Sequence, residues 1–396
     1  MNIERFSYYS LPSRSIMDTQ KKENILLLDG GHKKTLAILR TLGKKGVYRI
    51  DVGASSKRAI CFFSKYKGHK IYFPNPKTHP KKYQNAILKV ITTQKYIAVI
   101  PTDYISFLLC SEIIDQINEH SYLRIASTSQ FQKSSDKSQM ITMCQSLDIP
   151  VPYTRFIRSE NDVDGLKKQD IEVLKSSQER GTNFLSYPKS IDHAKQLASG
   201  FFEEYTDDLL LAQNKISGDG YGFFAFYKDG VCQRYFVHRR IREYPPSGGY
   251  SVAAEGIAND EVVEYGKQIL DHLRWNGVAM VEFKHDERSD KMIFMELNPK
   301  YWGSVELSIV CGVDFPQMMI DDAKGISVQS EEGYEKRKFQ WLLNGELFHF
   351  FERPSNIGAI LADMQYSTTD LWWRDLLPNF YQIVNIPMHY WRKWRR

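Results

Sequence analysis

The chain has 396 residues, 42% of them hydrophobic and 13% aromatic, which is enough apolar material for about two or three folded domains. Charged residues make up 25%, the net charge is only +6, and Lys and Arg form no dense cluster in the body of the chain. This composition excludes a disordered chain and argues against a nucleic-acid-binding protein.

Five scattered cysteines, an odd number without C-x-x-C spacing, argue against a disulfide framework and against a zinc site. Residues 1–23 are polar and lack the apolar core that a signal peptide needs. No apolar run approaches about eighteen residues, so no segment is expected to span a membrane. We therefore expect a soluble cytoplasmic protein with a loose N-terminal extension.

The first patterned region, residues 24–130, alternates strand and helix signals. The apolar run Ile25–Leu28 predicts a buried strand, helical spacing follows over Lys33–Leu42, and Val47–Val52 predicts a second strand. The Gly-Gly turn after the first strand lacks the G-x-G-x-x-G fingerprint, so we interpret it as a plain strand-to-helix turn. Further strands are expected at Lys70–Phe73 and Ile97–Ile100, and further helices around Pro80–Thr92 and Ser106–Glu119. This order predicts a Rossmann-like domain.

A segment rich in Ser, Gln and Lys, STSQFQKSSDKSQ from Ser127, marks the expected end of this domain. A helix is predicted from Asp136 to Leu147, where the two prolines of DIPVP end it. A second domain is expected to begin near residue 131.

Two alternating segments further along the chain predict a β-hairpin. Gly277–Lys284 and Lys291–Asn298 read as its strands, and their register places Glu282 directly across from Glu296. Asn298 follows on the same face, because side chains alternate along a strand. Two facing carboxylates between apolar neighbours repel each other unless a divalent cation lies between them. The oxygen donors suit Mg²⁺, and a polar hairpin face open to solvent is the alternative.

The segment from Val281 to Pro316, VEFKHDERSDKMIFMELNPKYWGSVELSIVCGVDFP, closely resembles the ATP-grasp superfamily. Within it, the segment is similar to members related to biotin carboxylase and to the large subunit of carbamoyl-phosphate synthase. The resemblance implies that Glu282, Glu296 and Asn298 bind the magnesium ions of ATP. The family motif E-I/L-N-P-R stands here as E-L-N-P-K, which gives Lys300 the expected catalytic position of the usual arginine.

By the same resemblance, the segment IEVLKSSQERGTNFLSYPKS from Ile171 to Ser190 is expected to supply the phosphate-binding lysine and a flap. Lys175 is the favoured lysine and Lys189 is its rival. The flap keeps only Gly181, whereas related proteins have several glycines whose backbone N–H groups close over phosphates. A stiffer or differently closing flap is therefore expected.

The strand Leu209–Ala212 is expected to lead to the hinge that binds the nucleotide base. The hinge residues implied by the resemblance are Gln213, Asn214 and Ile216. The usual Gln-Glu pair is Gln-Asn here, and the missing acid predicts a weaker contact with the ribose or the adenine.

Four basic residues lie within VHRRIREYPPSGGYS, residues 237–251. Alternation places His238, Arg240 and Arg242 on one face of a strand and Arg239 on the other. Arg240 and Arg242 are the catalytic candidates for holding an acid substrate and the transferred phosphoryl group, because arginine binds both groups with paired hydrogen bonds. The alternative is an edge strand whose charges prevent aggregation. The sequence does not single out a general base.

Residues 331–396 lie beyond the resemblance and end in WRKWRR. Trp interleaved with Arg suits an anionic membrane interface, so weak peripheral contact with the inner membrane face is one interpretation. The other interpretation is a helical cap on the catalytic domain with a solvated basic end.

The sequence therefore predicts an α/β and α+β protein. Its expected parts are a polar extension (1–23), a Rossmann-like domain (24–130), an ATP-grasp domain (131–330) and a C-terminal extension (331–396). The resemblance implies a ligase that uses ATP and Mg²⁺, or Mn²⁺, to activate a small-molecule carboxylate as an acyl phosphate for attack by an amine. Two alternatives stay open: an ATP-binding regulatory or scaffold protein with little turnover, and an ATP-grasp kinase that stops at phosphoryl transfer. The sequence predicts neither the substrates nor the oligomeric state.

Overall fold

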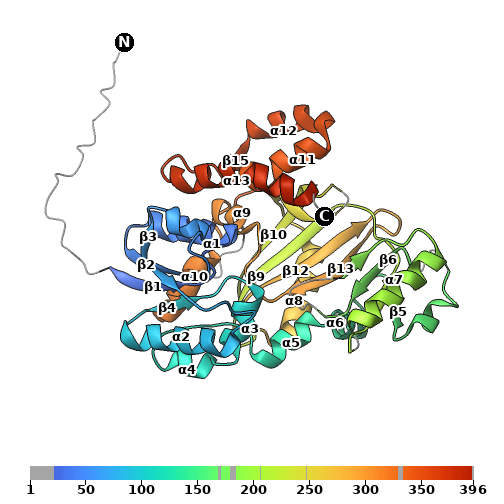
Figure 1. The fold of residues 1–396 in the computed structure, drawn as a ribbon, viewed down its shortest axis with the longest axis horizontal. Helices are drawn as coiled ribbons and strands as arrows, with labels where there is room; N and C mark the ends of the chain where they lie inside the picture. The colour runs from blue at the N-terminus through green and yellow to red at the C-terminus, as the bar shows by residue number, and fades with distance from the viewer. Residues whose placement is uncertain are drawn as a thin grey trace, which may run out of the picture.

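The described residues form three β-sheets covered by helices in a computed structural model of the chain. Figure 1 shows the N-terminal sheet in blue, a central sheet in yellow and orange, a small lobe in green and the C-terminal helices in red above the central sheet. The structure describes residues 22–167, 171–178, 184–205, 207–246, 248–328 and 333–394, with side chains up to residue 385.

The N-terminal sheet is parallel throughout, in the order β3-β2-β1-β4. Its parallel strands alternate with helices along the chain, which confirms the predicted Rossmann-like domain. The turn after β1 needs Gly30, because a Cβ there would lie 2.6 Å from Val52 Cγ1. The bounds are β1 Glu23–Leu27, β2 Tyr48–Ala54, β3 Lys67–Tyr72, β4 Ala98–Ile100, α1 Lys33–Lys44, α2 Pro80–Thr93, α3 Tyr104–Ser111 and α4 Ile114–Asn118.

Two predicted elements of this domain differ from the structure. β3 begins at Lys67 rather than Lys70, because pairing with β2 extends this edge strand through polar residues that carry no apolar signal. The helix predicted over Ser106–Glu119 is two helices, α3 and α4. Ile113 between them leaves the helical conformation (φ −124°, ψ 23°) without a glycine or proline that would signal the break.

The segment predicted as a polar boundary is helical instead. Ser127 starts α5 (Thr128–Ser135) through a capping box, in which Ser127 N donates to Gln130 Oε1 at 2.9 Å. Asp136 then caps α6 (Lys137–Ser146) and accepts hydrogen bonds from two backbone N–H groups. The Ser, Gln and Asp residues of this segment therefore start helices, and they do not form a linker.

A small antiparallel lobe follows, in the strand order β5-β8-β6-β7. Its core is built from apolar side chains such as Ile157, Leu174 and Phe201, with helix α7 packed on the sheet. The lobe lies beside the β12–β13 side of the central sheet in Figure 1. The bounds are β5 Thr154–Ile157, β6 Val173–Ser176, β7 Leu185–Ser186, β8 Leu210–Gln213 and α7 Ile191–Glu204.

The central sheet has seven strands in the order β13-β12-β9-β10-β11-β14-β15. Neighbouring strands are antiparallel except for the last pair. The sheet continues past residue 330, because β14 and β15 come from the segment that the sequence suggested to be a separate extension. The bounds are β9 Gly220–Lys228, β10 Val231–Tyr244, β11 Tyr250–Gly256, β12 Gly277–Asp286, β13 Lys291–Asn298, β14 Lys338–Gln340, β15 Ser367–Thr369, α8 Asp260–His272, α9 Val305–Val310 and α10 Phe315–Ala323.

The C-terminal helices are fastened to the N-terminal domain by a buried ion pair. Arg40 Nε donates to Asp375 Oδ2 at 2.9 Å, and both side chains are 2% exposed. Asn379 Oδ1 also accepts from Arg40, at 2.7 Å, and Tyr381 stacks on Phe63 with 4.6 Å between ring centroids. These contacts agree with the helical-cap interpretation of this segment. The bounds are α11 Leu347–Glu352, α12 Ile357–Met364 and α13 Leu376–Trp394.

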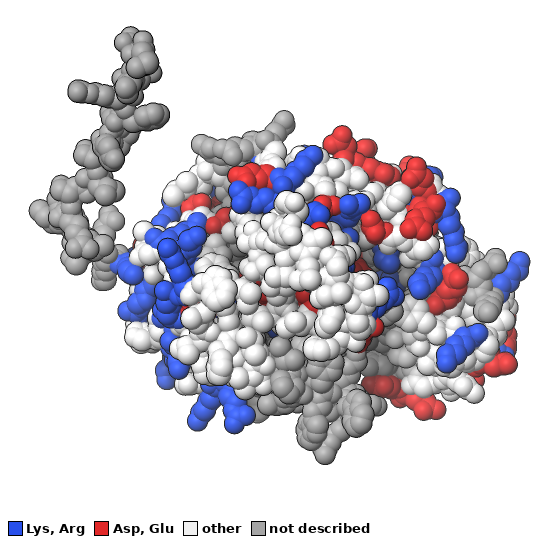
Figure 2. All heavy atoms as spheres, turned by 90° about the horizontal axis from the view of Figure 1, so that it is seen from above, with Lys and Arg blue, Asp and Glu red and all other residues white. Residues whose placement is uncertain are grey.

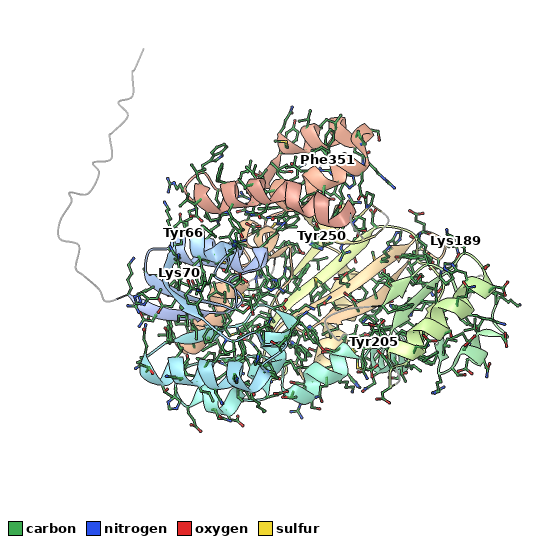
Figure 3. The ribbon with its side chains drawn as sticks, viewed as in Figure 1. Tyr66, Lys70, Lys189, Tyr205, Tyr250 and Phe351 are labelled. Atoms are coloured by element: carbon green, nitrogen blue, oxygen red, sulfur yellow. The ribbon has the colours of Figure 1, made fainter. Side chains whose placement is uncertain are left out.

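The outer face of the cap exposes large apolar side chains. Phe351, labelled in Figure 3, is 57% exposed, and Leu377 and Phe380 on α13 are more than half exposed. Figure 2 looks onto this side and shows a broad area without charged residues, bordered on one side by Lys and Arg. In the part of the chain that the structure describes, no helix combines the length and hydropathy needed to cross a bilayer. Peripheral membrane contact stays a prediction.

Candidate functional site

The β12–β13 ladder places the two predicted carboxylates opposite each other. Glu282 on β12 pairs with Glu296 on β13, in the predicted register, and Asn298 ends β13 beside them. The neighbouring pair Val281 and Leu297 is buried in the core, so a slip by one residue would expose apolar side chains. Burial of the apolar face therefore fixes the meeting of the two carboxylates.

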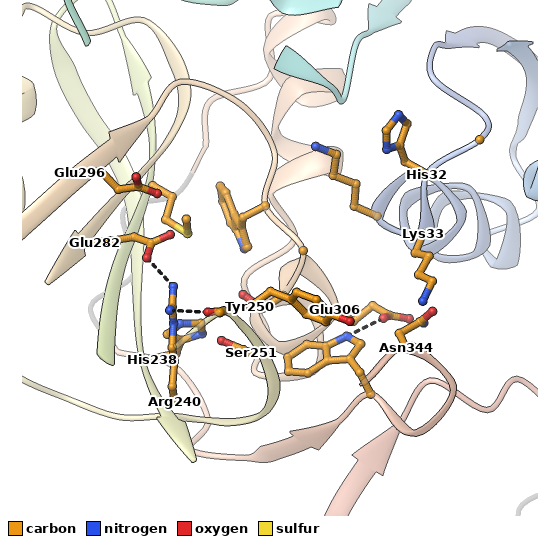
Figure 4. A pocket seen from close by; sticks show the side chains of 18 residues that line it. His32, Lys33, His238, Arg240, Tyr250, Ser251, Glu282, Glu296, Glu306 and Asn344 are labelled. Atoms are coloured by element: carbon orange, nitrogen blue, oxygen red, sulfur yellow. Dashed lines mark hydrogen bonds and ion pairs between the residues drawn. The ribbon is translucent and has the colours of Figure 1, made fainter. Parts of the chain in front are cut away.

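Asn298 and Arg240 hold the carboxylates together. Asn298 Nδ2 donates to Glu296 Oε1 at 2.9 Å and to Glu282 Oε1 at 3.2 Å. The Arg240 guanidinium donates to Glu282 Oε2 and forms an ion pair across the sheet, drawn as a dashed line in Figure 4. Lys300 Nζ donates to Asn298 Oδ1 at 3.0 Å. The structure thus brings these five predicted residues into one connected polar cluster.

The two carboxyl groups differ in their electrostatic surroundings. Burial raises the pKa of Glu282 to about 7, with Arg240 opposing the rise and Glu296 adding to it. Burial also opposes ionisation of Glu296, but Lys137, the Asn298 amide and two further lysines hold its pKa below the usual range. The pair therefore concentrates negative charge on Glu296, in a place where cations gather.

The donor set fits a hard divalent cation. Two carboxylates and one carboxamide offer oxygen ligands, which Mg²⁺ and Mn²⁺ prefer. Across the described ranges, no group of three or more His, Cys, Asp or Glu is placed to hold a metal ion, so an ion here would complete its shell with water or a bound ligand. In the structure, the Arg240 guanidinium and the Asn298 amide supply the hydrogen-bond donors that the carboxylate pair needs.

Lys175 on β6 interacts electrostatically with this cluster from the small lobe. Burial lowers the pKa of Lys175 to about 8, and the charge of Glu296 opposes that change. Lys137, the first residue of α6, acts on the same carboxylate and was not predicted from the sequence. The signal for Lys137 in the sequence was Asp136, because this helix cap fixes the direction in which the next side chain points. Lys189, the rival of Lys175, is exposed at the outer part of the lobe (Figure 3).

The predicted hinge residues follow β8. Gln213 is buried, and its Nε2 donates to Thr154 Oγ1 at 2.7 Å, so this side chain serves the sheet of the small lobe. Asn214 Oδ1 is buried and has no hydrogen-bond partner among the described residues. Ile216 is also buried. The expected hinge thus presents one unpartnered acceptor, while most of the predicted flap, residues 179–183, lies outside the described residues.

Arg240 and His238 line a cavity of about 670 Å³, shown in Figure 4. Arg240 is held at its wall by Glu243 Oε1 at 2.9 Å and by the Gly249 carbonyl at 3.0 Å, in addition to Glu282. His238 is buried, and burial and the Arg240 charge hold its pKa well below the usual range. The cavity is bordered by the turn before α1, the β10–β13 strands, the loop before α9 and the segment after β14.

Arg242 does not line this cavity, contrary to the predicted alternation. A β-bulge at Ile241 interrupts the pairing with β11 and turns Arg242 to the opposite face. There the guanidinium donates to Glu346 Oε1 and to Asp363 Oδ2, both at 2.6 Å. Arg242 therefore fastens β10 to the C-terminal segment, and nothing places it beside the carboxylate pair.

The buried ion pairs of Arg242 predict that its replacement lowers the stability of the fold. Arg242→Met should lower the free energy of unfolding by about 3–5 kcal/mol, because it leaves the Glu346 carboxylate buried without its partner. Arg239→Met on the same strand is the matched control. Because Arg239 pairs with Glu255 at a half-exposed position, this variant should lower the free energy of unfolding by only about 0–1 kcal/mol. Denaturant unfolding of the two variants measures the difference, and equal losses would contradict this assignment of Arg242.

Comparisons with known proteins agree on the architecture. Residues 233–342 match a family model described as ATP-grasp in the biosynthetic pathway with Ter operon. No curated protein sequence matches the chain. Among solved structures, N5-carboxyaminoimidazole synthetase from Staphylococcus aureus is 13% identical, with a TM-score of 0.60 over 85% of this chain and 86% of that one.

Two further solved structures with this fold are of proteins named for other reactions. L-amino acid ligase from Bacillus licheniformis is 12% identical, with a TM-score of 0.59 over 77% of this chain and 75% of that one. Biotin carboxylase from Campylobacter jejuni, solved as a complex with beta-gamma-ATP, is 15% identical, with a TM-score of 0.61 over 80% of this chain and 74% of that one. At these identities the likeness to the solved structures establishes the ATP-grasp fold, and residues 233–342 are similar to the ATP-grasp family model.

Proposed function

We propose that the protein is an ATP- and Mg²⁺-dependent ligase that activates a carboxylate as an acyl phosphate and joins it to an amine. One observation carries the proposal. Glu282, Glu296 and Asn298 converge on one point, and Lys175 from the small lobe interacts electrostatically with Glu296. Carboxylates that face cations across two lobes suit a metal-bound polyphosphate, whose negative charge needs both kinds of partner.

In this proposal each group of the cluster has its own part. Glu282, Glu296 and the Asn298 amide oxygen would hold Mg²⁺ (or Mn²⁺), which supplies Lewis-acid stabilisation of the charge on the transferred phosphoryl group. Lys175 and Lys137 would contact the phosphates, because an ammonium group is a compact charge that binds phosphate oxygens well. The backbone near Asn214 and Ile216 would contact the base.

The acid substrate would lie in the cavity beside Arg240. Its guanidinium already points toward the carboxylate pair and is held in place by Glu243 and Gly249. Arg240 would hold the substrate carboxylate near the phosphoryl donor, and Lys300 would offset charge near Asn298. Arg242 has no part in this proposal, because its partners are Glu346 and Asp363.

Two other functions are alternatives, and particular features favour one of them. A regulatory or scaffold protein that binds ATP with little turnover is favoured by Asn214 in place of the usual acid and by the single glycine of the flap. A kinase that stops at phosphoryl transfer would use the same cluster and need no amine. The L-amino acid ligase and the N5-carboxyaminoimidazole synthetase with the same fold favour the ligase.

Nucleotide binding tests the metal and phosphate assignments directly. In calorimetric titrations we expect the parent protein to bind ATP with Mg²⁺, and Glu296→Gln to weaken binding about tenfold or more, since it removes the charged metal ligand. Glu335→Gln, an exposed carboxylate paired with Arg337, is the matched control and should bind as the parent does. Binding that is equal in parent and Glu296→Gln, or independent of Mg²⁺, would contradict the proposed site.

Release of ADP separates the three functions. The parent protein is incubated with Mg²⁺, ATP and a panel of carboxylic acids, with and without a panel of amines. ADP release only when both an acid and an amine are present is the expected result. ADP release with acid alone, leaving a stable phosphorylated product, would favour the kinase. Binding of ATP without release in any mixture would favour the regulatory protein.

A further inference from the structure

Residues with no part in metal or nucleotide binding form one end of the cavity. Figure 4 shows Glu282 and Glu296 on one side and Lys33, Glu306 and Asn344 on the other. We propose that this far end binds the amine acceptor as a molecule that carries both an ammonium group and an anionic group, with Glu306 as the base that takes the ammonium proton. The proposal rests on the proposed function, because the acceptor needs an acyl phosphate to react with.

Buried polar atoms without partners point to a polar ligand in the cavity. His238 is 2% exposed and Trp302 is 4% exposed, and both line the cavity. Four of the buried polar atoms here have no hydrogen-bond partner among the described residues. They are His238 Nδ1 and Nε2, Trp302 Nε1 and Asn344 Oδ1. An unsatisfied buried polar group costs about 1–3 kcal/mol, so a ligand that satisfies these atoms would gain affinity.

Glu306 has the surroundings of a base. It lies in α9, is 8% exposed and borders the cavity, and its Oε2 accepts from Trp341 Nε1 at 3.0 Å. Among the described residues no cation lies within ion-pair distance of it. Burial raises the pKa of Glu306 to about 7, the charge of Asp370 adds to the rise, and Arg40 opposes it. A carboxyl group with such a pKa can accept a proton near neutral pH and release it again.

Lys33 provides the complementary cation for the anionic group. It lies in the first turn of α1, borders the cavity, and points toward Glu306 and Asn344 in Figure 4. No ion pair engages it within the described residues, whereas its neighbour Lys34 is paired with Asp103. The start of α1 also lacks a side-chain cap and acidic residues, so its backbone N–H groups favour an anion.

The attack of the amine on the acyl phosphate needs no further reagent. The ammonium gives one proton to the Glu306 carboxylate and becomes a neutral amine, whose lone pair attacks the acyl carbon. The C–N bond forms, the bond from the acyl carbon to the phosphate oxygen breaks, and inorganic phosphate leaves with the electron pair and the second amine proton. Glu306 then returns its proton to solvent. Lys33 positions the acceptor through its anionic group.

The proposed role of Glu306 as the base predicts that turnover depends on pH. Turnover with ammonium acceptors should fall as the pH drops below about 7, because Glu306 then holds its proton and cannot accept another. The charged groups that face Glu306 are Asp370, Arg40 and, at the same end of the cavity, Lys33. Of these, Asp370 has its pKa raised to about 6 by burial, so it titrates below Glu306. The break near pH 7 should be absent in Glu306→Gln, whose remaining turnover should rise with pH as the ammonium group itself loses its proton.

Hydroxylamine separates the role of Glu306 from the first half of the reaction. It is largely unprotonated at neutral pH, so it traps an acyl phosphate as a hydroxamate without needing a base. The parent and Glu306→Gln are compared with the same acid panel, once with hydroxylamine and once with the common amino acids as acceptors. Lys33→Met is the second variant, and Glu335→Gln is the control for replacing a carboxylate by an amide.

We expect Glu306→Gln to form hydroxamate as the parent does but to lose about 100-fold or more in kcat with amino acids, with little change in KM. Lys33→Met, at an exposed position, should raise KM for the amino acid about tenfold and leave kcat unchanged. Equal loss of both reactions in Glu306→Gln, or loss of neither, would overturn the proposal, as would an unchanged KM in Lys33→Met. A parent that forms no hydroxamate with any acid would instead refute the proposed ligase itself.

Discussion

Two carboxylates that face each other across one antiparallel ladder impose the main constraint on this protein. Glu282 and Glu296 are brought together by the burial of their apolar neighbours, and that burial also removes most of the water that would screen them. The arrangement is stable only with donors close by, and the structure supplies them from Arg240 and Asn298. The negative charge of the carboxylate pair must be balanced by cations. The pair is therefore well suited to bind a metal ion, and that ion can in turn bind a negatively charged ligand.

The rest of the architecture surrounds this pair with groups from distant parts of the chain. The small lobe contributes Lys175, the N-terminal domain contributes the first turn of α1, and the segment after β14 contributes Trp341 and Asn344. The C-terminal helices matter here because the Arg40–Asp375 pair and the Arg242–Glu346 pair fix this segment to the two domains. The C-terminal helices therefore help to hold the segment with Trp341 and Asn344 at the cavity wall, in addition to covering the core.

The sequence predicted the elements whose signal is local. The alternating strands of the β12–β13 hairpin set the Glu282–Glu296 register, and the motif E-L-N-P-K carries the resemblance to ATP-grasp proteins. What it could not predict depends on irregular backbone or on distant partners. The bulge at Ile241 moved Arg242 to the other face, because a bulge leaves no mark in the pattern of side chains. Glu306 and Lys33 meet only through the fold, 273 residues apart, so no spacing along the chain could have joined them.

The proposed function requires one divalent ion, bound with a nucleotide, between these carboxylates. Crystals of the full chain grown with Mn²⁺ and a non-hydrolysable ATP analogue would locate the ion by its anomalous scattering. We predict a peak within ligand distance of Glu282, Glu296 and Asn298, with the phosphates toward Lys175. A bound nucleotide whose ion lies elsewhere, with Arg240 still holding Glu282, would contradict it.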